Sequence, residues 1–80
     1  MKKVLLVEDS KIDAAYLTAV LKNAYIIEVA NTLFEAKVKI IEEPPDIIVL
    51  DLLLPDSSDE QTVNEIRYLV GKFKPKIIPI

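Results

Sequence analysis

Short apolar runs alternate along this chain with longer stretches in which apolar residues recur every three or four positions. The runs at residues 3–7, 25–30 and 46–50, and a further one at 76–80, are rich in valine, isoleucine and leucine, which predicts β-strands. The stretches between them have the spacing of amphipathic helices. Strands and helices in alternation indicate βαβ units and a parallel sheet.

The first helix is predicted over about residues 10–23, with Ser10 as its N-terminal cap and Asp13 at the third position of a capping box. Its apolar residues recur at spacings of three and four. These residues are Ile12, Tyr16, Ala19, Leu17, Val20 and Leu21. The strand that follows, at 25–30, contains Glu28 and is therefore expected at an edge of the sheet.

Two further helices are predicted from their start signals and their apolar faces. One opens with a capping box at Thr32–Glu35, carries a stripe of Phe34, Val38 and Ile41, and ends at Pro44-Pro45. The other begins at Ser57 or Ser58 and is expected to end near Gly71. Its apolar residues are Val63, Ile66, Leu69 and Val70. The uninterrupted strand at 46–50 is expected in the centre of the sheet.

Composition limits the class of protein. Eighty residues make one small domain, and an apolar share of 51% is high for a chain of that size. No stretch is long and apolar enough for a membrane span, and no signal peptide is present, so we expect a cytoplasmic protein. The chain has no cysteine and no histidine, which makes zinc chemistry an unsuitable explanation, and a net charge of −3 argues against nucleic-acid binding by this segment.

Acidic residues follow two of the predicted strands directly. Glu8 and Asp9 come after the first strand, and Asp51 closes the third. The carboxyl ends of parallel strands meet at one edge, which is where open α/β sheets bind ligands. Three carboxylates there repel one another, so a cation is expected between them, and Mg²⁺ suits oxygen ligands. The simpler alternatives are that Glu8 and Asp9 only favour a helix dipole and that Asp51 only ends a strand.

The acid pair, the lone Asp51 and the sequence Asp-Leu-Leu-Leu-Pro-Asp at 51–56 together resemble a response-regulator receiver domain. The similarity runs from Met1 to Ile80 without a gap. It implies a flavodoxin-like, doubly wound parallel sheet of the α/β class, whose family strand order is 2-1-3-4-5. For the strands in this chain, the expected order is 2-1-3-4.

The resemblance also implies a function, that of a signalling domain and not an enzyme in the usual sense. Asp51 would accept a phosphoryl group from a phosphohistidine on a histidine kinase or phosphotransfer protein. Mg²⁺ would be held by Asp9, Asp51 and the backbone carbonyl of Leu53, and Glu8 would act on it directly or through a water molecule. Asp56 and Asp59 are expected to be turn and helix-start residues, and the aromatic residues Tyr16, Tyr25, Phe34 and Phe73 are expected to pack.

The chain departs from the family pattern in two ways. Asp59 stands where the family usually has glycine, which tolerates a positive φ. The family's phosphoryl-binding Ser/Thr and Lys, and its last helices, would follow Ile80, so residues 1–80 correspond to the N-terminal two-thirds of the domain. We therefore expect weak Mg²⁺ binding, an incomplete switch, loss of cover on one side of the sheet, and self-association through an exposed edge.

Two alternatives remain open at this stage. The sequence could be part of a longer protein. The domain could also be an interaction or assembly module that keeps the acidic pocket without being phosphorylated.

Overall fold

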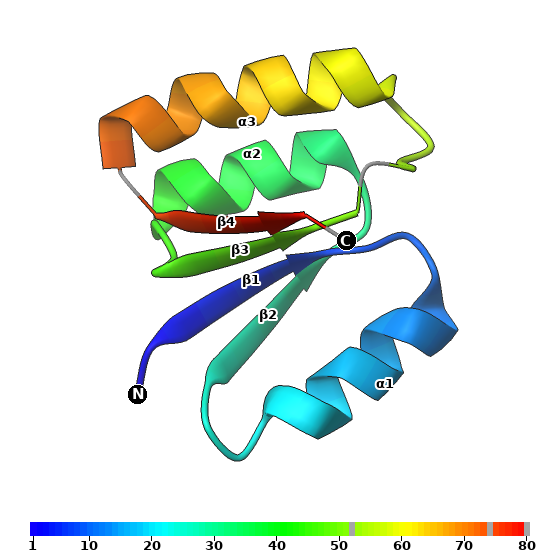
Figure 1. Ribbon diagram of the computed structural model, residues 1–80, viewed down its shortest axis with the longest axis vertical. Coiled ribbons are helices and arrows are strands. Elements are labelled where there is room, and N and C mark those ends of the chain that lie inside the picture. Colours follow the sequence, from blue (N-terminus) through cyan, green and yellow to red (C-terminus); the bar gives the residue numbers. More distant parts are fainter. Residues whose placement is uncertain (52, 74, 80) are drawn as a thin grey trace.

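The computed structural model describes residues 1–51, 53–73 and 75–79, and they form a parallel sheet with helices on both faces (Figure 1). The strands are β1 (Lys3–Val7), β2 (Ile26–Ala30), β3 (Ile47–Leu50) and β4 (Lys76–Pro79). The helices are α1 (Lys11–Leu21), α2 (Leu33–Glu42) and α3 (Asp59–Phe73). Ile80, predicted to end the fourth strand, lies outside the described residues.

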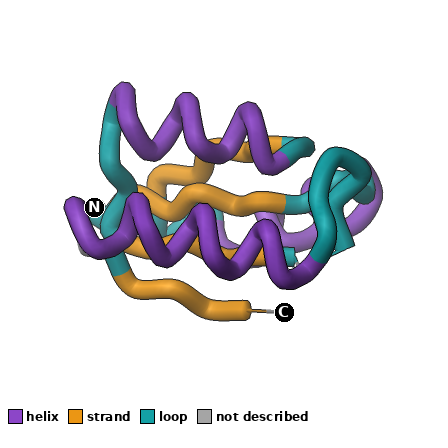
Figure 2. Tube along the Cα trace, turned by 90° about the horizontal axis from the view of Figure 1, so that it is seen from above, coloured by secondary structure: helices purple, strands orange, loops and turns teal. Residues whose placement is uncertain are grey.

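The strand order is β2-β1-β3-β4 and every pairing is parallel. The predicted α/β fold with order 2-1-3-4 is therefore confirmed, with β2 at an edge and β3 inside the sheet. Helices α2 and α3 cover one face, and α1 covers the other (Figures 1 and 2). The direct parallel pairing of β1 with β3 places the carboxyl ends of these two strands side by side.

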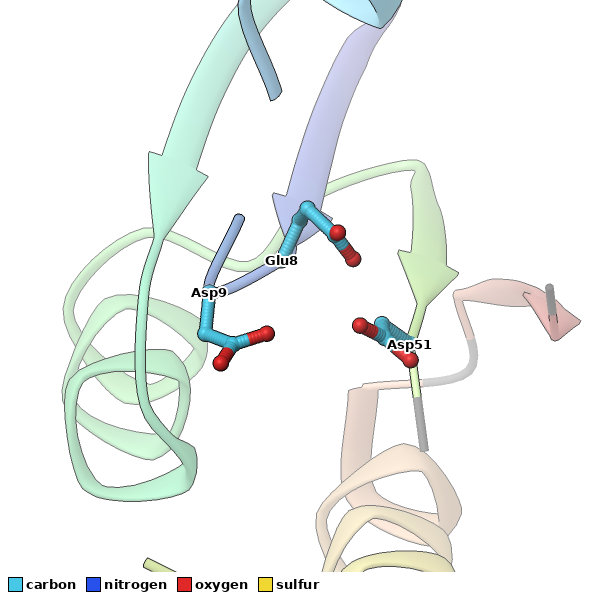
Figure 3. Close-up of side chains that lie close together, drawn as sticks. All are labelled: Glu8, Asp9 and Asp51. Atoms are coloured by element: carbon cyan, nitrogen blue, oxygen red, sulfur yellow. The ribbon is translucent and has the colours of Figure 1, made fainter. Parts of the chain in front are cut away.

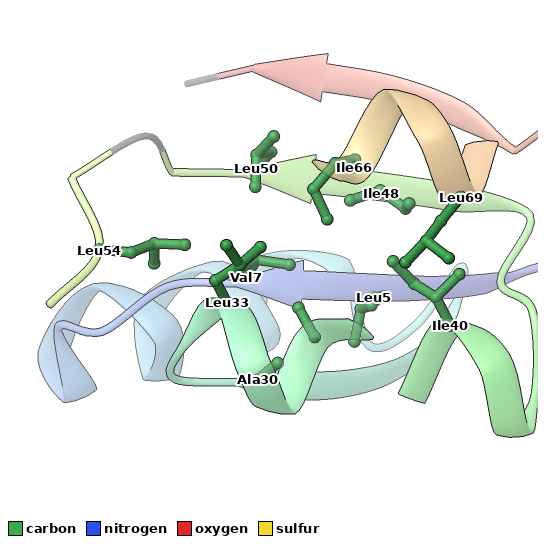
Figure 4. Packing of buried hydrophobic residues seen from close by; sticks show 11 residues of the cluster. Leu5, Val7, Ala30, Leu33, Ile40, Ile48, Leu50, Leu54, Ile66 and Leu69 are labelled. Atoms are coloured by element: carbon green, nitrogen blue, oxygen red, sulfur yellow. The ribbon is translucent and has the colours of Figure 1, made fainter. Parts of the chain in front are cut away.

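Alternate residues of β1 supply the two hydrophobic cores. Leu5 and Val7 point toward α2 and α3, where they pack with Ile48 of β3 and Ile66 of α3 (Figure 4). Val4 and Leu6 point to the opposite face and pack in a smaller cluster with Ala14 of α1. All these strand residues are buried. A strand buried on both faces has no polar alternation, which explains its continuous apolar sequence.

The face of α2 that meets the sheet is not the one predicted. Its buried residues are Leu33, Ala36 and Ile40. The predicted stripe is turned toward solvent, and Phe34 is 70% exposed. Both sets have helical spacing, so periodicity alone did not distinguish them. At the fully buried position 36 the helix presents only the small side chain of alanine to the sheet.

Helix α1 shows a similar correction. Ile12 and Tyr16 are 83% and 68% exposed, so the expectation that Tyr16 packs is wrong, as it is for Phe34. Ala14 is buried and Leu17 packs partly against the smaller core. Tyr25 does pack against that core, and the side chain of Phe73 lies outside the described part of the chain.

The expected loss of cover over the strands is also wrong. Val4 and Leu6, on the α1 side of β1, are 1% and 0% exposed, and Val49 of β3 is 9% exposed. On this side of the sheet, α1 itself carries exposed apolar surface, because its outer residues Ile12, Tyr16 and Val20 follow one another at intervals of four.

Helix α3 begins as predicted but ends later. Ser58 accepts a hydrogen bond from the Gln61 amide at 3.1 Å, and Asp59 is the first helical residue. A helical Asp59 needs no positive φ, so aspartate is compatible with the usual glycine position. Gly71 lies inside the helix and is not its cap, because the helix continues to Phe73. Thr62, which no apolar pattern singles out, is fully buried and shares a hydrogen bond with Ser57.

Ion pairs connect the elements at the amino ends of the strands. The Lys3 ammonium lies 3.1 Å from Glu28 and 3.3 Å from Glu43. The Lys3 amide donates to Asp46 at 2.8 Å, and Lys39 of α2 pairs with Glu28 at 3.0 Å. Burial opposes the charge on Lys3, but the two glutamates outweigh it and raise the pKa of its ammonium. This network joins β1, β2, α2 and the loop before β3.

Candidate functional site

The three acidic residues meet at the carboxyl ends of β1 and β3. Val7 and Leu50 are register partners in neighbouring strands, so the residues that follow them, Glu8 and Asp51, emerge side by side. The Asp51 amide donates to the Val7 carbonyl at 2.9 Å, which continues the ladder to this point. One carboxylate oxygen each from Glu8, Asp9 and Asp51 lies within 4.8 Å of the others. Figure 3 shows the three side chains directed toward one another.

Burial and mutual repulsion make Glu8 the unusual member of this acidic cluster. It is 4% exposed, whereas Asp9 is exposed and Asp51 is half-buried. Burial raises the pKa of Glu8 to about 7, assisted by a hydrogen bond with Asp51 and by the negative charges of Asp51, Asp13 and Asp9. In the metal-free protein Glu8 therefore holds a proton near neutral pH, which reduces the repulsion within the cluster.

No basic side chain of the described chain compensates these acids within 4.0 Å. The ion pairs found in the described part of the chain lie outside this cluster, and they join Lys3, Lys37 and Lys39 to Glu28, Glu43 and Glu65. An all-oxygen set of three converging carboxylates, in which burial and then the neighbouring acids raise the pKa of Glu8, fits a hard divalent cation such as Mg²⁺.

The loop after β3 is held at both of its described ends. At its start, the Leu53 amide donates to Asp51 Oδ1 at 2.9 Å. At its end, Asp56 accepts hydrogen bonds from two amides in the first turn of α2, those of Leu33 at 2.8 Å and Phe34 at 3.0 Å. Between them, the side chain of Leu54 is buried in the larger core. The role of the Leu53 carbonyl as a metal ligand stays a prediction.

Sequence analysis missed two residues that hold the site together. Asn31 donates from its side chain to the Glu8 carbonyl at 3.1 Å, and Asp56 links the β3–α3 loop to α2. Asp56 was expected to be a turn residue, and it does lie in a turn, but its carboxylate reaches a distant helix. The only sequence signal is an acid placed directly after Pro55, which does not reveal the partner.

Comparison with known proteins places this fold in a family. No protein-family model matches the chain, and no curated protein sequence matches it. Solved structures do match over nearly its whole length. The signal receiver domain of a Vibrio parahaemolyticus protein described as a LuxO repressor is 33% identical, with a TM-score of 0.86, and the match covers 98% of this chain and 59% of that one.

Two further receivers are similar. The Vibrio cholerae chemotaxis response regulator CheY4 is 30% identical, with a TM-score of 0.85 and coverage of 99% of this chain and 67% of that one. The receiver domain of PhyR from Erythrobacter litoralis is 25% identical, with a TM-score of 0.81 and coverage of 98% and 60%. The chain thus spans about three-fifths to two-thirds of the length of these structures.

A parallel sheet of order 2-1-3-4, with acids at the ends of β1 and β3, defines the fold class as a flavodoxin-like α/β domain. This chain belongs to the response-regulator receiver family. Receiver domains are signalling domains and not classical enzymes. Among the described helices, none has both the length and the apolar character needed to cross a membrane.

Proposed function

We propose that this chain is the phosphoacceptor module of a cytoplasmic response regulator, with Asp51 as the acceptor. The observation that carries the proposal is the convergence of Glu8, Asp9 and Asp51 at the carboxyl edge of a receiver fold. The donor is a phosphohistidine on a histidine kinase or phosphotransfer protein. Neither nucleic acid nor a membrane is a partner of this segment in the proposal.

In the proposed reaction, a carboxylate oxygen of Asp51 forms a bond to phosphorus. The bond between phosphorus and the donor's imidazole nitrogen breaks, and its electron pair stays with the nitrogen. Asp51 is suited to this role because it is only half-buried and so reachable by a donor. The hydrogen bond from the Leu53 amide to Oδ1 fixes the orientation of the carboxylate.

Glu8, Asp9 and Asp51, with the Leu53 carbonyl, would hold Mg²⁺. When bound, the ion supplies positive charge that offsets the repulsion between the acceptor carboxylate and the phosphoryl oxygens. Glu8 must release its proton for the site to bind a cation fully, so Mg²⁺ affinity should rise with pH through about 7.

The direct test is incubation of the purified chain with acetyl phosphate and Mg²⁺. We expect a gain of one phosphoryl mass on a fraction of the molecules, measured by mass spectrometry of the intact chain. The gain should disappear in Asp51→Asn and when Mg²⁺ is chelated. Asp59→Asn is the matched control, because Asp59 is an exposed acid on α3 outside the cluster, and it should retain the gain. No gain in the wild-type chain would contradict the proposal.

A second candidate is an interaction module that works through its surface without phosphorylation. Exposed apolar residues at helical spacing favour it, namely Ile12, Tyr16 and Val20 on α1 and Phe34, Val38 and Ile41 on α2. Exposed apolar stripes of this kind are typical of surfaces that bind other chains. The acetyl phosphate experiment distinguishes the two candidates, because an interaction module gains no phosphoryl mass.

We also propose that the 80-residue chain self-associates through β4. Within the described residues, β4 pairs only with β3, and Ile78 on it is 40% exposed. A strand edge with unpaired backbone groups can pair with another chain. Sedimentation velocity at micromolar concentration should show dimers or larger species, and Ile78→Lys should shift the distribution toward monomer. The control Ile12→Lys changes an exposed isoleucine on α1 and should leave the distribution unchanged. A wild-type monomer would refute this proposal.

A further inference from the structure

The amino end of α2, together with the residue just before its cap, makes hydrogen bonds with both loops that carry the acidic cluster. Just before the helix, Asn31 donates to the backbone carbonyl of Glu8 at 3.1 Å. In the turn itself, the amides of Leu33 and Phe34 donate to Asp56, which belongs to the β3–α3 loop. One end of one helix therefore contacts the loop of Glu8 and Asp9 and the loop that follows Asp51.

Asp56 is not needed to start α2, because a cap is already present. Thr32 accepts a hydrogen bond from the Glu35 amide at 3.1 Å and serves as the N-terminal cap. Asp56 instead accepts hydrogen bonds from two other amides of the same turn, those of Leu33 and Phe34. These amides have no carbonyl partner within the helix. Since these amides come from a residue stretch more than twenty positions away, the bonds fix the loop relative to the helix.

The hydrogen bonds that Asp56 accepts are charge-assisted, and bonds of this kind are stronger than those between neutral groups. Both oxygens of a carboxylate accept from backbone amides at the positive end of a helix, which favours the charged form. Consistent with this, the amide of Leu33, followed by that of Phe34, holds the pKa of Asp56 below its ordinary value against the opposing effect of burial. Asp56 therefore stays charged and bonded across the neutral pH range.

We propose that Asp56 is a positioning residue for the acidic site: by binding the first turn of α2, it holds residues 53–56 so that the Leu53 backbone faces Asp51. The segment is held at two points. The Leu53 amide donates to Asp51, and three residues later Asp56 accepts the amide of Leu33 in α2. The buried Leu54 leaves little slack between them. This inference rests on the proposed function for its effect on Mg²⁺, but not for its effect on the loop.

The test compares Asp56→Ala with Thr32→Ala. Both remove a side-chain acceptor from the first turn of α2, but only Asp56 joins that turn to the loop. In the metal-free protein, Asp56→Ala should speed amide hydrogen exchange at Leu53 about tenfold, because it removes charge-assisted hydrogen bonds that hold the loop. Thr32→Ala should leave exchange at Leu53 within about twofold of wild type, even where it lowers the melting temperature as much.

Mg²⁺ binding, followed by isothermal titration calorimetry, is the second measurement. Asp56→Ala should weaken it about tenfold, the usual cost of losing a group that orients a metal ligand, and Thr32→Ala should not weaken it. Asp56→Asn keeps one acceptor oxygen and should lie between wild type and Asp56→Ala in both measurements. It also gives the answer if Asp56→Ala does not fold.

The outcomes separate this inference from the proposed function. If the wild-type chain neither binds Mg²⁺ nor accepts a phosphoryl group, the proposed function fails, and the exchange rate at Leu53 alone decides whether Asp56 holds the loop. Equal effects of Asp56→Ala and Thr32→Ala on that rate, or no effect of either, would overturn the positioning role. A larger effect of Asp56→Ala on Leu53 supports it.

Discussion

Replacing Glu8 with glutamine should stabilise the metal-free protein above pH 7 and, at the same time, weaken its binding of Mg²⁺. Glu8 has an ordinary pKa of 4.5 when the chain is unfolded and a pKa of about 7 in the folded protein. Between these values the folded state binds more protons than the unfolded state, so the free energy of unfolding falls as pH rises. The loss is complete above about pH 7 and amounts to roughly 3 kcal/mol.

Glutamine removes this loss because it is neutral at every pH and can still donate a hydrogen bond to Asp51. Urea unfolding followed by circular dichroism, repeated from pH 4.5 to 8, should show a falling free energy of unfolding for wild type and a much flatter curve for Glu8→Gln. At pH 8 the variant should be more stable by roughly 3 kcal/mol, while calorimetry should show Mg²⁺ bound about tenfold more weakly.

Glu42→Gln is the matched control, since Glu42 is exposed at the C-terminal end of α2. It should leave both the pH dependence and Mg²⁺ binding unchanged. A Glu8→Gln variant with the pH dependence of wild type would show that the proton near neutral pH does not belong to Glu8. If Glu8→Gln raises stability but weakens Mg²⁺ binding, Glu8 is a residue kept for function at a cost in stability.

The second large effect is expected at Ile48, in the centre of β3. Its side chain is fully buried between β1, β4 and the helices α2 and α3 (Figure 4). Ile48→Ala removes buried methyl and methylene groups and leaves a cavity, which should lower the free energy of unfolding by about 3–4 kcal/mol. Because small domains are stable by only about 5–15 kcal/mol, this is a large part of the total.

Ile12→Ala provides the same chemical change at a position that is 83% exposed, and it should alter stability by less than about 0.5 kcal/mol. Both variants can be measured by thermal and urea unfolding. If Ile48→Ala is too unstable to purify, Ile48→Val should cost about 1 kcal/mol and preserve the comparison. Equal losses at the two positions would contradict the core described for β3.

The strands could be predicted from the sequence because the signal there is redundant, whereas their full order came from the resemblance to receiver domains. A run such as Ile47–Leu50 is apolar at every position, so any register buries apolar side chains on both faces. The acids at the strand ends follow from the same logic, because parallel strands bring their carboxyl ends to one edge. Fold class and the cluster of Glu8, Asp9 and Asp51 therefore needed no knowledge of side-chain packing.

The sequence did not reveal which apolar face of each helix packs against the sheet. Helix α2 carries two apolar sets, and the structure buries Leu33, Ala36 and Ile40 instead of the stripe that begins at Phe34. Periodicity gives the angle between residues on a helix, not the angle at which the helix meets its neighbour. The same limitation left Tyr16 wrongly assigned to the core.

Long-range polar contacts were beyond local sequence patterns altogether. Asp56 lies more than twenty residues from the amides that it binds, and its neighbours identify only a turn.

The predicted end of α3 near Gly71 was wrong for a different reason. Glycine permits a helix to end but does not require it, and α3 continues for two more residues.

The ion pairs around Lys3 have a consequence for how the molecule opens. They lie at the amino ends of the strands, whereas the carboxyl ends carry three acids and no compensating base within the described residues. Attraction therefore closes one end of the sheet, whereas the three carboxylates at the other end repel one another fully once Glu8 has lost its proton, above about pH 7. Above that pH, local unfolding of the metal-free protein should begin beside Glu8 and Asp51, and it should reach the amino ends of β1 and β2 last.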